Sequence, residues 1–314
     1  MGQMSRRKQL ETILSEKIVV LDGAFGTEIQ RMDNTLLSPY EPLNATNSEL
    51  VKRVHRSYVE AGSDIISTNS FNCSYLELLK HGYSKDEIDK LNVLAAKNAK
   101  EVAAEYNRDI FVAGSVGPTS QSLSLRTIEF DEMADSYKAQ ISSLIKGGVD
   151  LILVETCFDA KNIRAAVYAY LASLSDLNLT TDDVPLMVSV TLTGQGNLLS
   201  GHTVDIVWQM IKHAKPLSFG LNCGFGFERA AELVMKLQDI PTNVSLYPNA
   251  GLPDLDGRYT ESCADFNRRA NVLAKEGCIN LIGGCCGTTP EHIQTIKNAV
   301  DGIAPRAIPQ QKIN

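Results

Sequence analysis

DLILVETCFDAKNIRAAVYAYLASLSDLNLTTDDVPLMVSVTL, residues 150–192, contains one complete β–α–β pattern. Its two ends, 150–157 and 185–192, are almost continuously apolar, which is typical of parallel strands covered on both faces. Between them, residues 159–175 carry apolar side chains at three- and four-residue spacing, as an amphipathic helix does. Parallel neighbours need such a crossover connection, so this stretch predicts a parallel α/β architecture.

The same alternation continues over the rest of the 314-residue chain. Further strands are predicted at 17–23, 64–71, 110–118, 218–224, 243–251 and 279–287. Further helices are predicted at about 50–62, 84–106, 129–147, 203–215, 227–238, 261–276 and 290–301. Eight β–α units favour a closed (β/α)8 TIM barrel, and a doubly wound open sheet is the alternative. We therefore expect one α/β domain over 1–306, followed by a C-terminal tail or linker at 307–314.

Local signals support several of these boundaries. Thr46 and Glu49 have the spacing of a capping box at the start of the helix over 50–62. Thr289 is a plausible N-cap before Pro290, and proline is favoured at the first helical position. The longest loop, MDNTLLSPYEPLN at 32–44, follows the first strand, and we expect it to fold over the mouth of the barrel.

Composition excludes several classes of function. The net charge is −7 and no run of lysine or arginine forms a basic patch, which argues against nucleic acid as a partner. No stretch approaches the roughly 18 apolar residues of a membrane helix, and the charged N-terminus lacks a secretory signal. The seven cysteines are an odd number in a chain without an export signal. We therefore expect reduced thiols and a cytoplasmic location.

Chemistry-bearing residues gather at the carboxyl ends of the predicted strands, which is where TIM barrels place their active sites. Those ends are Asp22-Gly23, Asn69, Gly117-Pro118, Glu155-Thr156, Thr191, Asn222-Cys223, Asn249-Ala250-Gly251 and Cys285-Cys286-Gly287. Buried polar groups are costly unless they have a partner, so this pattern predicts a functional rim.

Three of these residues are cysteines: Cys223, Cys285 and Cys286. Three thiolates suit zinc and leave its fourth position open, as in a catalytic rather than a structural site. Vicinal ligands need an irregular backbone, which the glycines at 283, 284 and 287 can provide. Cysteine is also a common buried small hydrophobe, so the residues alone leave both interpretations open. Cys157 is expected to pack in the core, and His202 to form a loop hydrogen bond.

Two carboxylates accompany the thiols at the predicted rim. Asp22 and Glu155 fit three roles: capping a turn, binding a substrate ammonium group, or acid/base catalysis. The glycines of DGAFGT (22–27) leave backbone N–H groups that suit a small carboxylate.

Six blocks of the sequence carry a family resemblance. The chain resembles the homocysteine-binding domain of cobalamin-dependent methionine synthase from about residue 10 to about 306. The blocks are LDGAFGTE (21–28), DIISTNSFN (64–72), LVETCFD (153–159), GLNCGFG (220–226), YPNAG (247–251) and GGCCGTTPEHI (283–293).

The resemblance implies a zinc-bearing (β/α)8 barrel and a role for each matched residue. Cys223, Cys285 and Cys286 match the zinc ligands and form the catalytic group. Asp22 and Glu155 match the carboxylates that hold the homocysteine amino group. Its carboxylate is expected at the backbone of Gly23, Ala24, Phe25 and Gly26, with Asn222 as a further substrate contact. Asn249 matches the residue that can occupy the fourth zinc position when substrate is absent.

The implied activity is homocysteine S-methylation. A thiol is a poor nucleophile at neutral pH, and zinc would keep the homocysteine sulfur as a thiolate that accepts the methyl group to give methionine. The expected donor is methylcobalamin carried by a corrinoid domain or protein. A stand-alone enzyme using S-methylmethionine or betaine is the alternative, although GGCCGTTP with Gly287 favours the cobalamin branch. A non-enzymatic zinc protein would need four closed ligands, and a Schiff-base aldolase would need a strand-end lysine, which the eight predicted ends lack.

Overall fold

Eight parallel strands form the centre of the molecule, in a computed structural model that describes residues 4–310. The strands are β1 (Val19–Val20), β2 (Ile65–Ser67), β3 (Phe111–Val116), β4 (Leu151–Cys157), β5 (Leu186–Val190), β6 (Ser218–Gly226), β7 (Asn243–Asn249) and β8 (Leu281–Ile282). Their order is β1-β8-β7-β6-β5-β4-β3-β2, and a bridge between Leu21 and Ile65 joins the first strand to the second. The sheet therefore closes, which confirms the predicted TIM barrel and excludes the open sheet.

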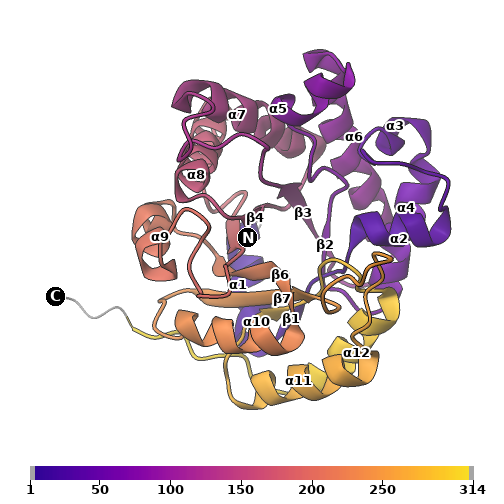
Figure 1. Ribbon diagram of the computed structural model, residues 1–314, viewed down its shortest axis with the longest axis vertical. Coiled ribbons are helices and arrows are strands. Elements are labelled where there is room, and N and C mark those ends of the chain that lie inside the picture. Colours follow the sequence, from indigo (N-terminus) through magenta and orange to yellow (C-terminus); the bar gives the residue numbers. More distant parts are fainter. Residues whose placement is uncertain (1–3, 311–314) are drawn as a thin grey trace.

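Helices surround the strands on the outside (Figure 1). The eight predicted ones are present: α4 (Ser48–Glu60), α6 (Lys85–Ala103), α7 (Phe130–Gly147), α8 (Ala160–Asp176), α9 (Val204–Ile211), α10 (Phe227–Val234), α11 (Cys263–Lys275) and α12 (Pro290–Val300). Four others were not predicted: α1 (Arg6–Glu16), α2 (Phe25–Met32), α3 (Leu43–Thr46) and α5 (Tyr75–Leu78). Single 3-10 turns lie at Leu79–His81, Lys212–Ala214 and Met235–Leu237. Within the described part of the chain, no helix combines the length and apolar character needed to cross a bilayer.

One predicted helix start is wrong by a residue. The N-cap of α4 is Asn47, whose side chain accepts the Leu50 N–H at 3.3 Å, rather than Thr46. Thr46 ends the short helix α3 instead, and its hydroxyl donates to the Pro42 carbonyl at 3.1 Å. At the other end of the chain, Pro290 is the first residue of α12 directly after Thr289, as predicted.

The barrel has two apolar layers. Alternate strand residues such as Leu151 and Leu153 face inward, and their neighbours Ile152 and Val154 pack against the surrounding helices. The inward cluster also contains Leu10 and Leu14 of α1. This helix was missed because only a few apolar residues interrupt its charged sequence, and their burial depends on a barrel formed by later residues.

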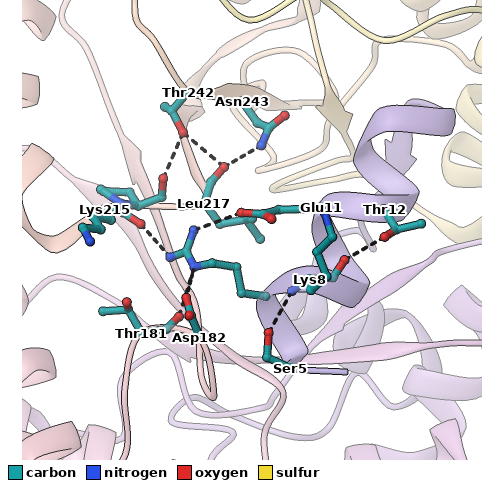
Figure 2. A network of polar contacts seen from close by, with 12 residues as sticks. Ser5, Lys8, Glu11, Thr12, Thr181, Asp182, Lys215, Leu217, Thr242 and Asn243 are labelled. Carbon is teal, nitrogen blue, oxygen red and sulfur yellow. Dashed lines mark hydrogen bonds and ion pairs between the residues drawn. The ribbon is translucent and has the colours of Figure 1, made fainter. Parts of the chain in front are cut away.

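A polar network fixes α1 at the amino-terminal end of the barrel. The Arg7 guanidinium donates to the carbonyls of Thr181, at 3.2 Å, and of Lys215, at 2.7 Å. It also forms ion pairs with Glu11 and Asp182, and Figure 2 shows how these partners converge from separate segments. Because α1 occupies this end, the opposite end, where the strands finish, is the open one. Of the predicted tail at 307–314, residues 311–314 lie outside the described part of the chain.

Candidate active site

The three predicted ligand cysteines meet at the open end of the barrel. The sulfur atoms of Cys223, Cys285 and Cys286 all lie within 4.8 Å of one another. Within residues 4–310, they are the one group of three or more histidine, cysteine or carboxylate side chains close enough to share an ion. Cys223 comes from β6, and the vicinal pair follows β8.

Irregular backbone brings these sulfurs together. The pairing of β6 with β7 shifts register after Asn222, where Cys223 adopts a positive φ of 58°. Beyond β8, the Cys285 N–H donates to Pro248 O at 2.8 Å, which holds the pair against the end of β7. A Cβ on Gly284 would lie only 2.3 Å from the Thr288 hydroxyl, and Gly287 has a φ of +79°. The glycines around the pair are thus required for close approach at 284 and for a left-handed turn at 287.

The three sulfurs differ in how readily each gives up its proton. Hydrogen bonds from the Cys223 and Cys285 thiols lower the pKa of Cys286 to about 3. The pKa of Cys285 lies well above its usual value because its hydrogen bonds with both neighbours, and then its burial, favour the protonated form. Three clustered thiols are soft donors that lose their protons when they bind a divalent cation, so the donor set fits a thiolate-bound metal.

A cavity of about 390 Å³ opens beside the sulfurs. It is lined by all three cysteines and by the predicted substrate residues Asp22, Gly23, Ala24, Phe25, Gly26 and Glu155. The structure therefore brings residues that are as far apart in the chain as Asp22 and Cys286, 264 positions, into the lining of one cavity. Two predicted residues, Asn222 and Asn249, do not line this cavity.

The two carboxylates of the cavity are buried. Asp22 accepts hydrogen bonds from the Ser67 N–H, at 2.6 Å, and from its hydroxyl, at 3.0 Å. Glu155 accepts one from the Ser115 hydroxyl at 2.6 Å. Burial raises the pKa of each carboxyl group to about 7, and the nearby Asp22 charge contributes to the rise at Glu155. No cation among the described residues forms a salt bridge with either, so a bound ammonium group would be their counter-ion.

The start of α2 offers backbone donors to the same cavity. Ala24 is its N-cap and provides no side-chain cap, and the first N–H groups of a helix have no partner within it. The Ala24 N–H itself is taken by the Thr288 hydroxyl at 3.2 Å, which leaves the following amides. A helix start of this kind suits a carboxylate.

The loop at 32–44 contributes residues that sequence reasoning did not single out. Ser38, Tyr40 and Glu41 line the cavity, so the prediction that this loop covers the mouth is confirmed. Glu41 is only 3% exposed; one of its oxygens accepts the Asn72 N–H at 2.7 Å and the other has no partner. Burial raises its pKa. The sequence signal that could have identified Glu41 is its position between Pro39 and Pro42 in the longest loop.

Tyr259 was also missed. It lies on the loop between β7 and α11, and a Cβ at Gly287 would come within 2.1 Å of its ring. Its hydroxyl hydrogen-bonds to Cys286 and helps to lower the pKa of that thiol. The contact depends on two loops that are distant in sequence, so no local pattern indicated it.

The two predicted asparagines lie beside the cavity rather than in its wall. Asn249 ends β7, next to Ala250, whose N–H donates to Cys286 O at 2.9 Å. The side-chain oxygen of Asn249 is buried and has no hydrogen-bond partner. Asn222 instead uses its amide on neighbouring protein groups. Elsewhere, Cys157 packs in the core and His202 hydrogen-bonds to the Ser200 hydroxyl at 3.1 Å, both as predicted.

Comparison with known proteins identifies a family and similar solved structures. The model of the homocysteine S-methyltransferase family matches residues 19–300. The metallated form of the homocysteine methyltransferase MmuM from Escherichia coli is 22% identical, covers 93% of this chain and 99% of its own, and has a TM-score of 0.75. The apo form of the same enzyme is 23% identical, with coverage of 90% and 96% and a TM-score of 0.70. At these identities, the likeness to solved structures shows a shared fold.

Proposed function

This chain belongs to the homocysteine S-methyltransferase family and is therefore a methyltransferase, and we propose that it converts homocysteine to methionine at a zinc ion held by Cys223, Cys285 and Cys286. The observation that carries the proposal is that three clustered sulfurs and two buried carboxylates share one cavity. The sulfurs suit the thiol end of the substrate and the carboxylates its ammonium end.

Zinc fits the donor set because three thiolates are soft ligands that leave one position open. Bound there, zinc would lower the pKa of the substrate thiol, so that the sulfur is a thiolate at neutral pH. The unpartnered oxygen of Asn249 supports its role as the fourth ligand when substrate is absent.

The remaining residues would orient the amino acid. Asp22 and Glu155 bind its ammonium group, and the backbone from Gly23 to Gly26 binds its carboxylate at the start of α2. With both ends fixed, the sulfur is directed toward the incoming methyl group, and most of the benefit is positioning. The sulfur lone pair forms the bond to the methyl carbon, and the donor leaves with the electron pair of the bond that breaks.

For the methyl donor we propose methylcobalamin on a corrinoid domain or protein. Among residues 4–310, the five most exposed large apolar side chains are all leucines, between 60% and 107% exposed. All five lie in connections that lead from a strand to the next barrel helix, at the same end as the cavity. We call them the rim leucines, and they are Leu37, Leu125, Leu199, Leu252 and Leu255. Exposed apolar groups around a mouth suit a protein partner, whereas a free small donor needs none.

A donor comparison tests this function. Zinc-loaded protein and homocysteine are incubated separately with methylcobalamin, with a methylated corrinoid protein, with S-methylmethionine and with betaine, and methionine is measured. We expect slow turnover with free methylcobalamin and faster turnover with the corrinoid protein. Efficient turnover with S-methylmethionine or betaine alone would replace the cobalamin assignment by the stand-alone alternative.

Variants of the rim leucines sharpen the test. Leu37→Ser with Leu125→Ser should slow transfer from the corrinoid protein and leave transfer from free methylcobalamin unchanged. Ile206→Ser is the matched control, because Ile206 is 48% exposed on α9. Equal slowing by the control, or slowing with the free donor, would contradict docking at the rim.

A further inference from the structure

Asn222 makes four hydrogen bonds with its side-chain amide, although it is only 2% exposed. Its oxygen accepts the Thr156 N–H at 3.0 Å and the Ser189 hydroxyl at 2.7 Å. Its nitrogen donates to the Thr156 hydroxyl at 2.7 Å and to the Cys285 sulfur at 3.9 Å. A primary amide has two acceptor sites and two N–H donors, so none is left for a ligand.

Two of these bonds hold a strained residue. Thr156 has a φ of +57°, a left-handed conformation that is a genuine outlier for a β-branched residue. The register between β4 and β5 shifts at the same place, between Val154 and Cys157. Such strain persists only where neighbouring groups enforce it, and Asn222 binds both the N–H and the hydroxyl of Thr156. The irregularity determines the direction of the preceding residue, Glu155.

The fourth bond reaches the sulfur cluster. The amide N–H of Asn222 points at Cys285, which follows β8, and Cys223 is the next residue along β6. An N–H donor stabilises negative charge on a sulfur and fixes its position, as groups behind a metal ligand commonly do. One side chain therefore contacts both the Cys285 sulfur of the metal-binding cluster and the segment that presents Glu155.

From this geometry we propose that Asn222 is a positioning residue that couples the metal-binding sulfurs to the carboxylate that binds the substrate ammonium group. The inference rests on the proposed function and revises one part of it. Asn222 does not contact the substrate directly; it holds Thr156, the neighbour of Glu155, and the Cys285 sulfur. Losing the amide should weaken two separate properties, zinc affinity through Cys285 and homocysteine affinity through Thr156 and Glu155.

The first experiment removes the amide in Asn222→Ala and, at constant size, in Asn222→Asp. Zinc affinity is measured by competition with a chelator, and homocysteine affinity by calorimetry on zinc-saturated protein. We expect both affinities to fall about tenfold in Asn222→Ala, the size of effect that about 1.4 kcal/mol produces. Cobalt(II)-substituted protein should also show a shifted thiolate-to-metal absorption band. The control is Ser189→Ala, which removes one bond to Asn222 without touching Thr156 or Cys285.

The second experiment separates the two arms by rescue. Glycine adopts a positive φ without strain, so Thr156→Gly no longer needs Asn222 to hold it. In the Asn222→Ala background, Thr156→Gly should restore homocysteine affinity to within about threefold of wild type. Zinc affinity should stay low, because Cys285 still lacks its donor. A thermal unfolding midpoint near that of wild type in each variant would show that the barrel is intact.

The outcomes distinguish the coupling from the function beneath it. A wild-type chain that binds neither zinc nor homocysteine would refute the proposed function itself. If wild type binds both, unchanged affinities in Asn222→Ala and Asn222→Asp would overturn the coupling alone. So would an equal loss in Ser189→Ala, or a double variant in which Thr156→Gly restores nothing.

Discussion

Glu155→Gln should make the zinc-free protein more stable and a worse binder of homocysteine. Burial raises the pKa of this carboxyl from 4.5 to about 7, so the folded protein holds the proton more tightly than the unfolded chain does. A raised pKa contributes stability that is present below pH 4.5 and is lost as the pH rises through 7. The two pKa values differ by about 2.5, and each pKa unit corresponds to about 1.4 kcal/mol. The contribution to the free energy of unfolding is therefore about 3 kcal/mol.

Glutamine has the same size and carries no charge at any pH, so Glu155→Gln should escape this loss. In urea unfolding at pH 8, the variant should exceed wild type by up to about 3 kcal/mol, and at pH 4 the two should converge. Asp22 also has a pKa of about 7, so the stability of the Glu155→Gln variant should still depend on pH in part.

Binding should change in the opposite direction. A hydrogen bond to a charged group is worth about 1.5–3 kcal/mol, so the variant should bind homocysteine about 10- to 100-fold more weakly at pH 8. Below pH 7 the wild-type carboxyl is protonated, and the difference between the two proteins should shrink. The ratio of the two affinities across pH 6–8.5 removes the titration of the substrate thiol, which both proteins share. A ratio that stays constant with pH, or a variant less stable than wild type at pH 8, would refute the reasoning.

Three further outcomes are expected. Elemental analysis should find about one zinc per chain in wild type and in the control Cys157→Ser. Serine substitution of any one of Cys223, Cys285 and Cys286 should remove the zinc and leave the circular dichroism spectrum unchanged. Gly287→Ala should lower zinc affinity in a chelator competition, because its φ of +79° and the 2.1 Å approach of a neighbouring ring leave no room for a Cβ; wild-type affinity would contradict that packing. Arg7→Ala should lower the free energy of unfolding by about 1–3 kcal/mol and leave homocysteine affinity unchanged, since its bonds lie at the opposite end of the barrel; a change in affinity would argue against that separation.

The sequence predicted more of the barrel than of the site because the two depend on signals of different range. Apolar runs such as 150–157 are local, and eight of them separated by amphipathic helices are sufficient to indicate the barrel. Strand ends follow from the same runs, so the convergence of Asp22, Glu155 and the three cysteines was predictable before any packing was known. Helix α1 was not, because its two buried leucines pack against strands that come later in the chain.

Position at a strand end is therefore what the sequence by itself determined for each candidate residue, since strand length and period are properties of neighbouring residues. The direction of each side chain was decided only by the tertiary structure. Asn222 stands at a strand end, as predicted, yet its amide turns to Thr156, 66 positions away, and to Cys285, 63 positions away. Thr156 and Cys223 adopt positive φ angles that their own sequences do not favour. Such backbone persists only because distant segments pack against it, and that long-range dependence is why local pattern could locate these residues but not orient them.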